Sequence, residues 1–246
     1  MQEQTDGKRI LDRPGLNTPG EDAAWEGLRE RVAITLRPIG APTSIGFFGL
    51  AAATFCVAGL QLGWVAEAEG KKVALVLIGF AFVAQLIAGI FSFLGRDGVA
   101  ATAMLTLALT WLVVGATLWS SKPGSTSDVL GLFLLFGAAG MALLAATAAL
   151  SKLVPALVFA VASIRFLLTG IYELSSRHGW EHAAGLVGLV LFFLAMYAGW
   201  ASALEDATGQ TILPFGRHGK GKIAIRGSLL EQVKDAPTEA GVRTQL

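Results

Sequence analysis

The stretch Ala41-Pro-Thr-Ser-Ile-Gly-Phe-Phe-Gly-Leu50 marks the point at which a polar N-terminal segment becomes a series of apolar runs. Pro42 stands where a first helix would begin, and proline costs no hydrogen bond in a first helical turn. Ser44 is placed to cap that helix by accepting a hydrogen bond from a free backbone N–H group. Gly46 and Gly49 carry no side chain, so we expect another backbone to approach the first turns closely.

The composition around this stretch indicates an integral membrane protein. Of 246 residues, 54% are hydrophobic and only 15% are charged, and the mean hydropathy is +0.61, whereas a soluble domain carries about 25% charged residues. The charges gather toward the two ends, which predicts a polar tail at 1–40, a membrane domain at 41–206 and a cytosolic tail at 207–246. Residues 22–36 fit either an amphipathic helix at the membrane surface or an ordinary partner-packing or disordered segment.

Six apolar runs are each long enough to cross a bilayer core, which takes about 20 residues in a helix. They lie at 44–66, 73–94, 98–120, 128–150, 153–174 and 182–204. The runs are continuous rather than alternating, so they predict helices, and the short connections make neighbouring helices antiparallel. The expected fold is an all-α integral membrane protein with six transmembrane helices.

Lysine and arginine near the ends of the runs predict the orientation in the cell membrane, because these residues favour the cytosolic side. The side with both tails holds Arg29, Arg31, Arg37, Arg96, Lys152, Arg217, Lys220 and Lys222, and the other side holds Lys71, Lys72, Lys122 and Arg177. We therefore expect cytosolic N- and C-termini. Trp64, Trp119 and Trp180 fall at the opposite end and predict an aromatic belt, whereas Trp111 lies within a span as an expected packing residue.

Arg165 is a charged residue deep inside a predicted span. It stands about 18 Å along its helix from residue 153, near the middle of the membrane. A central arginine costs about 2.5–3.5 kcal/mol even on a lenient insertion scale. No carboxylate lies at a matching depth. Arg165 is therefore either an anion site, since its planar fork suits a carboxylate, or a residue that bonds helix-end carbonyls at a subunit contact.

Polar side chains recur along single faces of two predicted helices. In the third run, the hydroxyl residues on one face are Thr102, Thr106, Thr110 and Thr117. Such a stripe either lines a wet passage or bonds one helix to another. In the second run, Gln85 shares a face with Gly89 and Ser92.

The sequence shows no cluster of the kind that enzymes, metal sites or nucleic-acid sites need. The histidines lie near or beyond the ends of the spans, and no His, Cys, Asp or Glu group has metal-ligand spacing. The basic segment 216–222 lacks the ending of a phosphate loop and is expected to be solvated or to contact anionic lipid. We therefore predict a membrane protein that is not an enzyme, with no cofactor, no metal and no nucleic-acid partner.

Three motifs occur in order along the predicted spans. The first is Ala41–Gly49, the second is Gln85-Leu-Ile-Ala-Gly89, and the third joins Tyr197, Glu205 and Leu213-Pro-Phe-Gly216. In order and spacing they resemble the motifs of the acetate uptake transporter family, also called succinate–acetate permeases. The first corresponds to that family's Asn-Pro-Ala-Pro-Leu-Gly-Leu signature followed by X-Gly, and Trp111 aligns with its third-helix tryptophan. The resemblance implies a helical bundle around a pore in each protomer and a homohexamer.

Departures from the family pattern bear on the expected narrow point. The family's asparagine is Ala41 here, and its second proline is Ser44. The resemblance implies a ring of bulky side chains from the first, third and fifth helices, at Leu50, Leu107 and Ala162. Because these are two leucines and an alanine, we expect a looser ring, made more attractive to anions by Arg165 one turn further on.

The resemblance implies transport of small monocarboxylates such as acetate, and of succinate, by a passive or proton-linked route. The expected pathway residues are Leu50, Leu107, Ala162, Arg165, Thr106, Thr110 and Gln85, with Pro42, Ser44, Gly46 and Gly49 at the mouth. The expected partners are the carboxylate anion, a proton that rides on the substrate or uses the interface histidines, and membrane lipid. Two alternatives stay open: a low-selectivity anion channel on the same scaffold, and a non-transporting membrane scaffold or sensor that acts through its tails.

Overall fold

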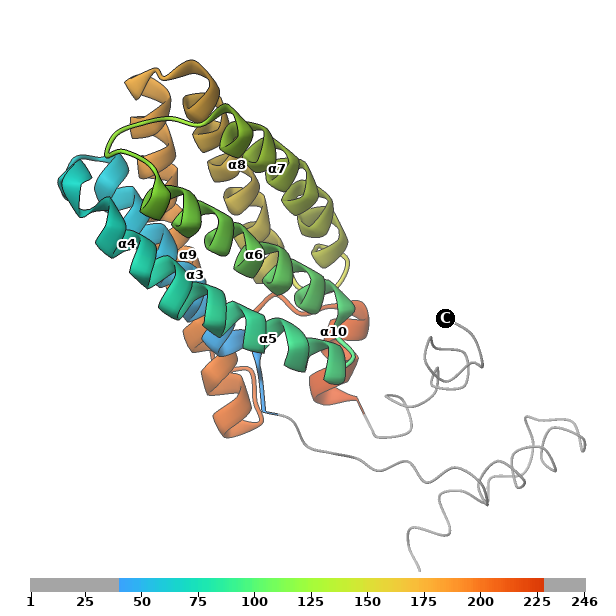
Figure 1. Ribbon diagram of the computed structural model, residues 1–246. Coiled ribbons are helices and arrows are strands. Elements are labelled where there is room, and N and C mark those ends of the chain that lie inside the picture. The colour runs from blue at the N-terminus through green and yellow to red at the C-terminus, as the bar shows by residue number, and fades with distance from the viewer. Residues whose placement is uncertain (1–39, 228–246) are drawn as a thin grey trace, which may run out of the picture. The chain divides into compact units, whose positions relative to one another are not determined.

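The computed structural model describes residues 40–227, and six of its helices are long and apolar enough to cross a membrane (Figure 1). In chain order they are α3 (Thr43–Gln61), the composite span Glu67–Leu94, α6 (Gly98–Ser120), α7 (Asp128–Ala148), α8 (Leu153–Ser175) and α9 (His178–Thr208). The composite span consists of η1 (Glu67–Glu69), α4 (Gly70–Val76), η2 (Leu77–Phe82) and α5 (Val83–Leu94). The all-α, six-span prediction is confirmed, and the predicted segment 22–36 lies outside the described residues.

The first helix ends earlier than its apolar run predicts. The run continues to residue 66, but α3 stops at Gln61. Gly63 has a positive φ of 72°, and the backbone N–H groups of Gly63 and Trp64 turn back to Leu60 and Gly59. A glycine in the left-handed conformation is a common helix terminator, because it lets the next N–H groups bond the last free carbonyls.

The prediction that Ser44 caps the first helix is wrong. The helix begins at Thr43, because Pro42 already has near-helical angles (φ −71°, ψ −21°) and takes the capping position without a side-chain hydrogen bond. Ser44 is therefore a residue of the first turn, and its hydroxyl oxygen is buried with no partner among the described residues. The start of α3 is instead fastened to α9, through Ala41 N–H to Asp206 Oδ1 (3.1 Å) and Thr43 to Ser202 (2.9 Å between hydroxyl oxygens).

Close packing occurs at both Gly46 and Gly49, but a backbone atom is among the nearest atoms only at Gly49. A Cβ atom on Gly46 would lie 2.6 Å from the sulfur of Met104 and 2.8 Å from the Cβ of Ala88. One on Gly49 would lie 3.0 Å from the Cβ of Ala84 and 3.3 Å from the Ala81 carbonyl oxygen. The first helix therefore packs tightly on the second span, beside the π-helical turn η2, a helix type that often accompanies functional sites.

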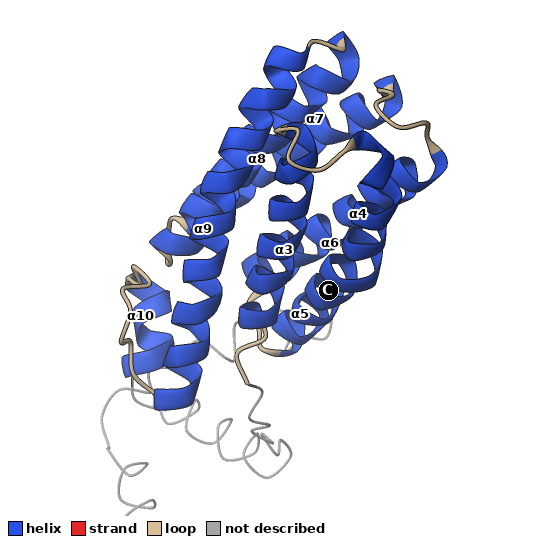
Figure 2. Ribbon diagram, turned by 90° about the vertical axis from the view of Figure 1, so that its left-hand side faces the viewer, coloured by secondary structure: helices blue, strands red, loops and turns tan. Residues whose placement is uncertain are grey.

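Most packing joins helices that are neighbours in sequence. The largest exception is α3, the first span, which packs along α9, the last span. α7 and α8 lie side by side in both ribbon views, α5 packs on α6, and α9 lies against both α3 and α8 (Figures 1 and 2). α3, α6 and α8 all run in the same direction, because two antiparallel turns separate each from the next. The end at which these three helices begin, at Thr43, Gly98 and Leu153, is called here the vestibule end.

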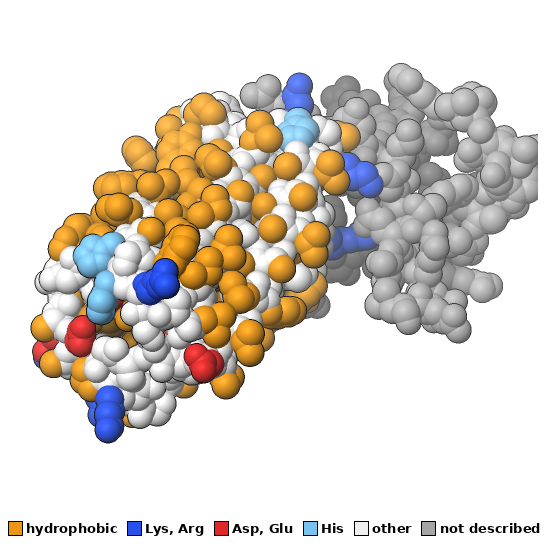
Figure 3. Space-filling view, turned by 90° about the horizontal axis from the view of Figure 1, so that it is seen from above, with side chains coloured by type: hydrophobic (Ala, Val, Ile, Leu, Met, Phe, Trp, Pro, Cys, Tyr) orange, Lys and Arg blue, Asp and Glu red, His pale blue; other side chains and the backbone are white. Residues whose placement is uncertain are grey.

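The outer surface has the character expected in lipid. Apolar side chains cover its sides, whereas charged side chains gather toward the two ends (Figure 3). Trp64, Trp119 and Trp180 are all exposed at the end opposite the vestibule, as an aromatic belt requires, and Trp111 is buried.

The segment after α9 folds back onto the vestibule end. Gly209 ends α9 with a positive φ, and residues 214–218 then run beside the start of α8 before the short helix α10 (Gly219–Arg226). The N–H groups of Leu153 and Val154 donate to the carbonyls of Gly216 (3.1 Å) and Phe215 (3.3 Å). This strap, residues 209–218, thus satisfies backbone donors that the first turn of α8 would otherwise leave free.

Candidate functional site

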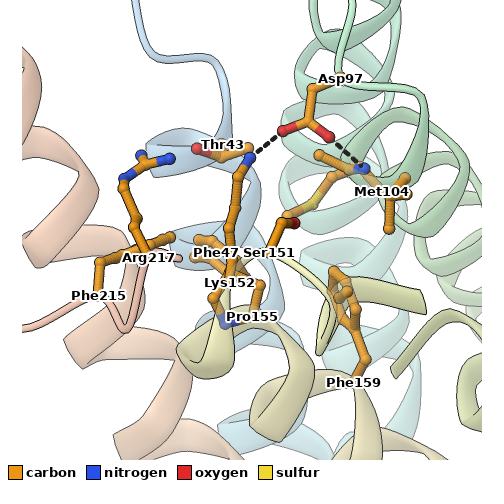
Figure 4. A pocket seen from close by; sticks show the side chains of 13 residues that line it. Thr43, Phe47, Asp97, Met104, Ser151, Lys152, Pro155, Phe159, Phe215 and Arg217 are labelled. Carbon is orange, nitrogen blue, oxygen red and sulfur yellow. Dashed lines mark hydrogen bonds and ion pairs between the residues drawn. The ribbon is translucent and has the colours of Figure 1, made fainter. Parts of the chain in front are cut away.

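A pocket opens at the vestibule end between α3, α6 and α8. Its rim holds Asp97 and Lys152, which form an ion pair and point toward one another (Figure 4). Asp97 also accepts from the Ala100 N–H group at 3.0 Å and so caps α6. Phe215 and Arg217 of the strap form another wall. The pocket is therefore closed on one side by a segment that follows the last membrane span.

The charges at the rim are matched in pairs. The side chains of Lys152 and Asp97 are 22% and 30% exposed. Arg217 donates from Nε to both carboxylate oxygens of Glu205, at 3.0 and 2.9 Å, and Glu205 is 5% exposed. Because each cation has its own carboxylate, the rim adds little net positive charge to the pocket.

The floor of the pocket is apolar and leads to a second apolar layer. Phe47, Met104 and Phe159 line the floor, one from each of the three parallel helices. One helical turn further in, the next residues on the same faces are Leu50, Leu107 and Ala162. All six side chains are buried and belong to one apolar cluster. The two layers form an apolar plug below the pocket, and its inner layer contains the three residues that the sequence resemblance assigns to a ring.

The next turn brings a polar layer around Arg165. The guanidinium is 2% exposed and lies inside the protomer, not on its outer surface. Nη1 donates to the Thr54 hydroxyl, and Nη2 donates to Gln61 Oε1 at 3.3 Å. Cζ lies 5.8 Å from the centre of the Trp111 ring. Among the described residues, Arg165 therefore contacts neutral groups of α3 and α6.

The surroundings of Arg165 form a connected network. The Thr54 hydroxyl donates a hydrogen bond to the Gly188 carbonyl (3.3 Å), and Gln61 Nε2 donates to the Thr169 hydroxyl (3.3 Å). A Cβ atom on Gly188 would lie 3.0 Å from Arg165 Nε. The glycine on α9 thus leaves the room that the arginine side chain occupies.

Three threonines of the α6 stripe bond their own helix and not a neighbouring one in the contacts among the described residues. Thr102, Thr110 and Thr117 each donate to the carbonyl four residues earlier on their own helix, at 2.8, 2.8 and 2.9 Å. Such local bonding is a common alternative for threonine within a helix. Thr102 is exposed, Thr106 is half-buried and Thr110 is buried, so the stripe also does not face one environment.

Gln85 is buried at the contact between the second span and α3. It is 0% exposed, and its Cγ atom would lie 3.4 Å from a Cβ on Gly49. Neither its amide nitrogen nor its amide oxygen has a partner among the described residues. A buried amide left without a partner costs about 1–3 kcal/mol.

Several residues of this arrangement could not be singled out from the sequence. Thr54 and Gln61 fall in an apolar run, and only the fold places them against Arg165. By contrast, parts of the third sequence motif do meet: Tyr197 donates to the Pro214 carbonyl at 2.8 Å, and Glu205 holds Arg217. This motif thus serves to hold the strap against the vestibule end.

These features define a class of protein. It is a multi-pass α-helical membrane protein in which three parallel helices enclose a column with a polar mouth, an apolar plug and a buried arginine. The chain belongs to the GPR1/FUN34/yaaH family, whose model matches residues 29–215. The resemblance seen in the sequence motifs is thereby confirmed.

The relatives are transport proteins by name. The chain is 26% identical over 173 residues to Ammonia transport outward protein 2 of Saccharomyces cerevisiae, a match over 65% of this chain and 60% of the yeast protein's length. It is 24% identical over 180 residues to the succinate-acetate/proton symporter SatP of Escherichia coli K12, over 71% of this chain and 94% of SatP. The structure of the bacterial acetate channel SatP shares the fold, with a TM-score of 0.66, 22% identity and coverage of 73% of this chain and all of that one.

Proposed function

We propose that this protein moves small monocarboxylate anions, acetate first among them, across the cell membrane along the column between α3, α6 and α8. The observation that carries the proposal is Arg165, a buried guanidinium with neutral hydrogen-bond partners directly beyond an apolar plug. A charge in a low-dielectric interior strongly attracts an ion of opposite sign. The names of the two SatP relatives, one a succinate-acetate/proton symporter and one an acetate channel, support the substrate class.

The positive charge of Arg165 also favours a carboxylate over ammonium, the two kinds of substrate for which the relatives are named. The yeast relative is named for ammonia transport. An ammonium cation near Arg165 would be repelled, and within residues 40–227 no carboxylate forms an ion pair with the arginine. A carboxylate anion is therefore the better fit to this chain.

In the proposed mechanism, Leu50, Leu107 and Ala162 form the gate, with Phe47, Met104 and Phe159 above it. Arg165 attracts the carboxylate after it passes the gate, and Gln85, Thr106 and Thr110 lie along or beside the route. Pro42, Ser44, Gly46 and Gly49 build the mouth. The protein acts without chemistry on its substrate, as a homohexamer with cytosolic termini, and tails 1–40 and 207–246 regulate or anchor it.

Uptake of labelled acetate into proteoliposomes tests the proposal, with Ala162→Phe as a variant that fills the gate. Wild-type uptake is expected above protein-free liposomes, with a strong loss in Ala162→Phe. Ala160→Phe is the matched control, because Ala160 is half-buried two residues away, on a different face of α8. Absent wild-type uptake, or equal loss in both variants, would refute the assignment.

A low-selectivity anion channel is the second candidate, favoured by the small Ala162 side chain in the gate. Single-channel currents in planar bilayers distinguish the two. A channel gives currents that follow a chloride or acetate gradient and ignore a pH gradient. A proton-linked carrier instead concentrates acetate when only a pH gradient is imposed.

A further inference from the structure

Two buried hydrogen-bond donors, one in Arg165 and one in the neighbouring Trp111, have no acceptor in the part of the chain that the structure describes. One is Arg165 Nε, and the other is the indole Nε1 of Trp111; both have no partner among the described residues. They belong to side chains that contact one another, since the guanidinium carbon lies 5.8 Å from the Trp111 ring centre. Buried N–H groups are nearly always paired, so two orphans at one contact point to a missing acceptor.

The electrostatics of the site point to the same missing partner. Arg165 is buried, and among the described residues its other two nitrogens bond only the hydroxyl of Thr54 and the amide oxygen of Gln61. Four ion pairs are seen in residues 40–227, and none includes Arg165. An uncompensated charge in a protein interior costs several kcal/mol, and an anion that accepts hydrogen bonds would remove much of that cost.

We propose that Arg165 Nε–H and Trp111 Nε1–H together bind one small monovalent oxyanion, with Trp111 as a direct ligand and not only a packing residue. This inference rests on the proposed function for the identity of the anion, a carboxylate. A carboxylate fits because its two oxygens accept from two donors on different helices. The site carries a single positive charge, so a monoanion neutralises it and a dianion leaves one negative charge buried.

Indole resonances of the ¹⁵N-labelled protein test the proposal. The chain has six tryptophans, and Trp111→Phe identifies the Trp111 signal while keeping an aromatic ring beside Arg165. Acetate is expected to shift this signal with saturation, nitrate to do the same, and succinate at equal concentration to shift it less. Trp119→Phe is the matched control, because Trp119 is exposed at the far end of α6.

Affinity supplies the second readout. A hydrogen bond to a charged group is worth about 1.5–3 kcal/mol, so Trp111→Phe should weaken acetate binding about tenfold or more, since about 1.4 kcal/mol is a factor of ten. Gly188→Ala tests the site without touching Trp111, because its Cβ would lie 3.0 Å from Arg165 Nε. It should also weaken acetate binding.

The outcomes separate this inference from the proposed function. If proteoliposomes take up acetate but the Trp111 signal does not move and Trp111→Phe binds acetate normally, the donor pair is wrong and the transport proposal stands. If acetate uptake is absent while nitrate and acetate shift the Trp111 signal, the anion site stands and the transport proposal fails. A succinate response as strong as that of acetate would overturn the preference for monoanions.

Discussion

Replacing Arg165 by methionine separates a structural role for this arginine from a role in attracting anions. The substitution keeps much of the side-chain length but removes the charge and the hydrogen bonds to Thr54 and Gln61. Thr54 keeps its bond to the Gly188 carbonyl, and Gln61 keeps its bond to Thr169. Of the two hydrogen-bond acceptors of Arg165 seen in residues 40–227, only the amide oxygen of Gln61 is then left without a partner.

The expected change in stability is small because two large contributions offset each other. Two hydrogen bonds to a charged group are worth about 1.5–3 kcal/mol each. Removing a buried charge that lacks a counter-ion recovers several kcal/mol of desolvation cost. We therefore expect the melting temperature of Arg165→Met to stay within about 5 °C of wild type, since about 1 kcal/mol corresponds to roughly 2–4 °C at this chain length.

The expected change in transport is large. An anion that loses a charged partner worth about 1.5–3 kcal/mol binds roughly 10- to 100-fold more weakly. Initial uptake of labelled acetate at low concentration should fall by that factor in Arg165→Met and by less in Arg165→Lys, which keeps the charge. Arg177→Met is the control, because Arg177 is exposed in the connection before α9.

Two results would refute this reasoning. One is wild-type uptake by Arg165→Met at low acetate concentration, which would mean that the anion does not meet the guanidinium. The other is a fall of well over 10 °C in the melting temperature of Arg165→Met with none in Arg165→Lys, which would make the charge a structural requirement.

The other predictions concern the second span, the rim and the strap. Gln85→Leu should raise the melting temperature, because it removes a buried amide that has no partner among the described residues, and such an amide costs about 1–3 kcal/mol. Acetate uptake should nonetheless fall. Unchanged uptake would exclude Gln85 from the pathway. Asp97→Lys and Lys152→Asp should each alter uptake more than the double exchange, which restores the pair; the part-exposed pair itself is worth less than about 1 kcal/mol. Arg217→Ala should destabilise the protein by about 3–5 kcal/mol in thermal unfolding, because it leaves the buried Glu205 without its cation. An unchanged melting temperature there would show that the strap is not held by this pair.

Arg165 forms no ion pair within residues 40–227, and this distinguishes the interior of the column from its mouth. At the vestibule end, Lys152 and Arg217 each face a carboxylate. Around Arg165, the contacts come from a hydroxyl, an amide oxygen and an aromatic ring. On the proposed pathway, an anion is therefore attracted most strongly after it has passed the apolar layers.

Much of the fold follows from the sequence alone. The six spans follow from hydropathy and length, because a lipid-embedded backbone must form its own hydrogen bonds and so becomes helical wherever the chain is apolar for about 20 residues. The depth of Arg165 and the close contact at Gly46 and Gly49 follow from helical rise and from the absence of a side chain. The family follows from three motifs in order.

Only the tertiary structure decided which faces of these helices meet. It brought Thr54 and Gln61 to Arg165 and placed Phe215 and Arg217 of the strap along one wall of the pocket. Hydropathy and helical period are properties of one segment, whereas these contacts depend on the rotation and depth of one helix against another. In lipid those are fixed by close packing of small residues and by a few polar contacts, and one sequence read along its length does not reveal its partners.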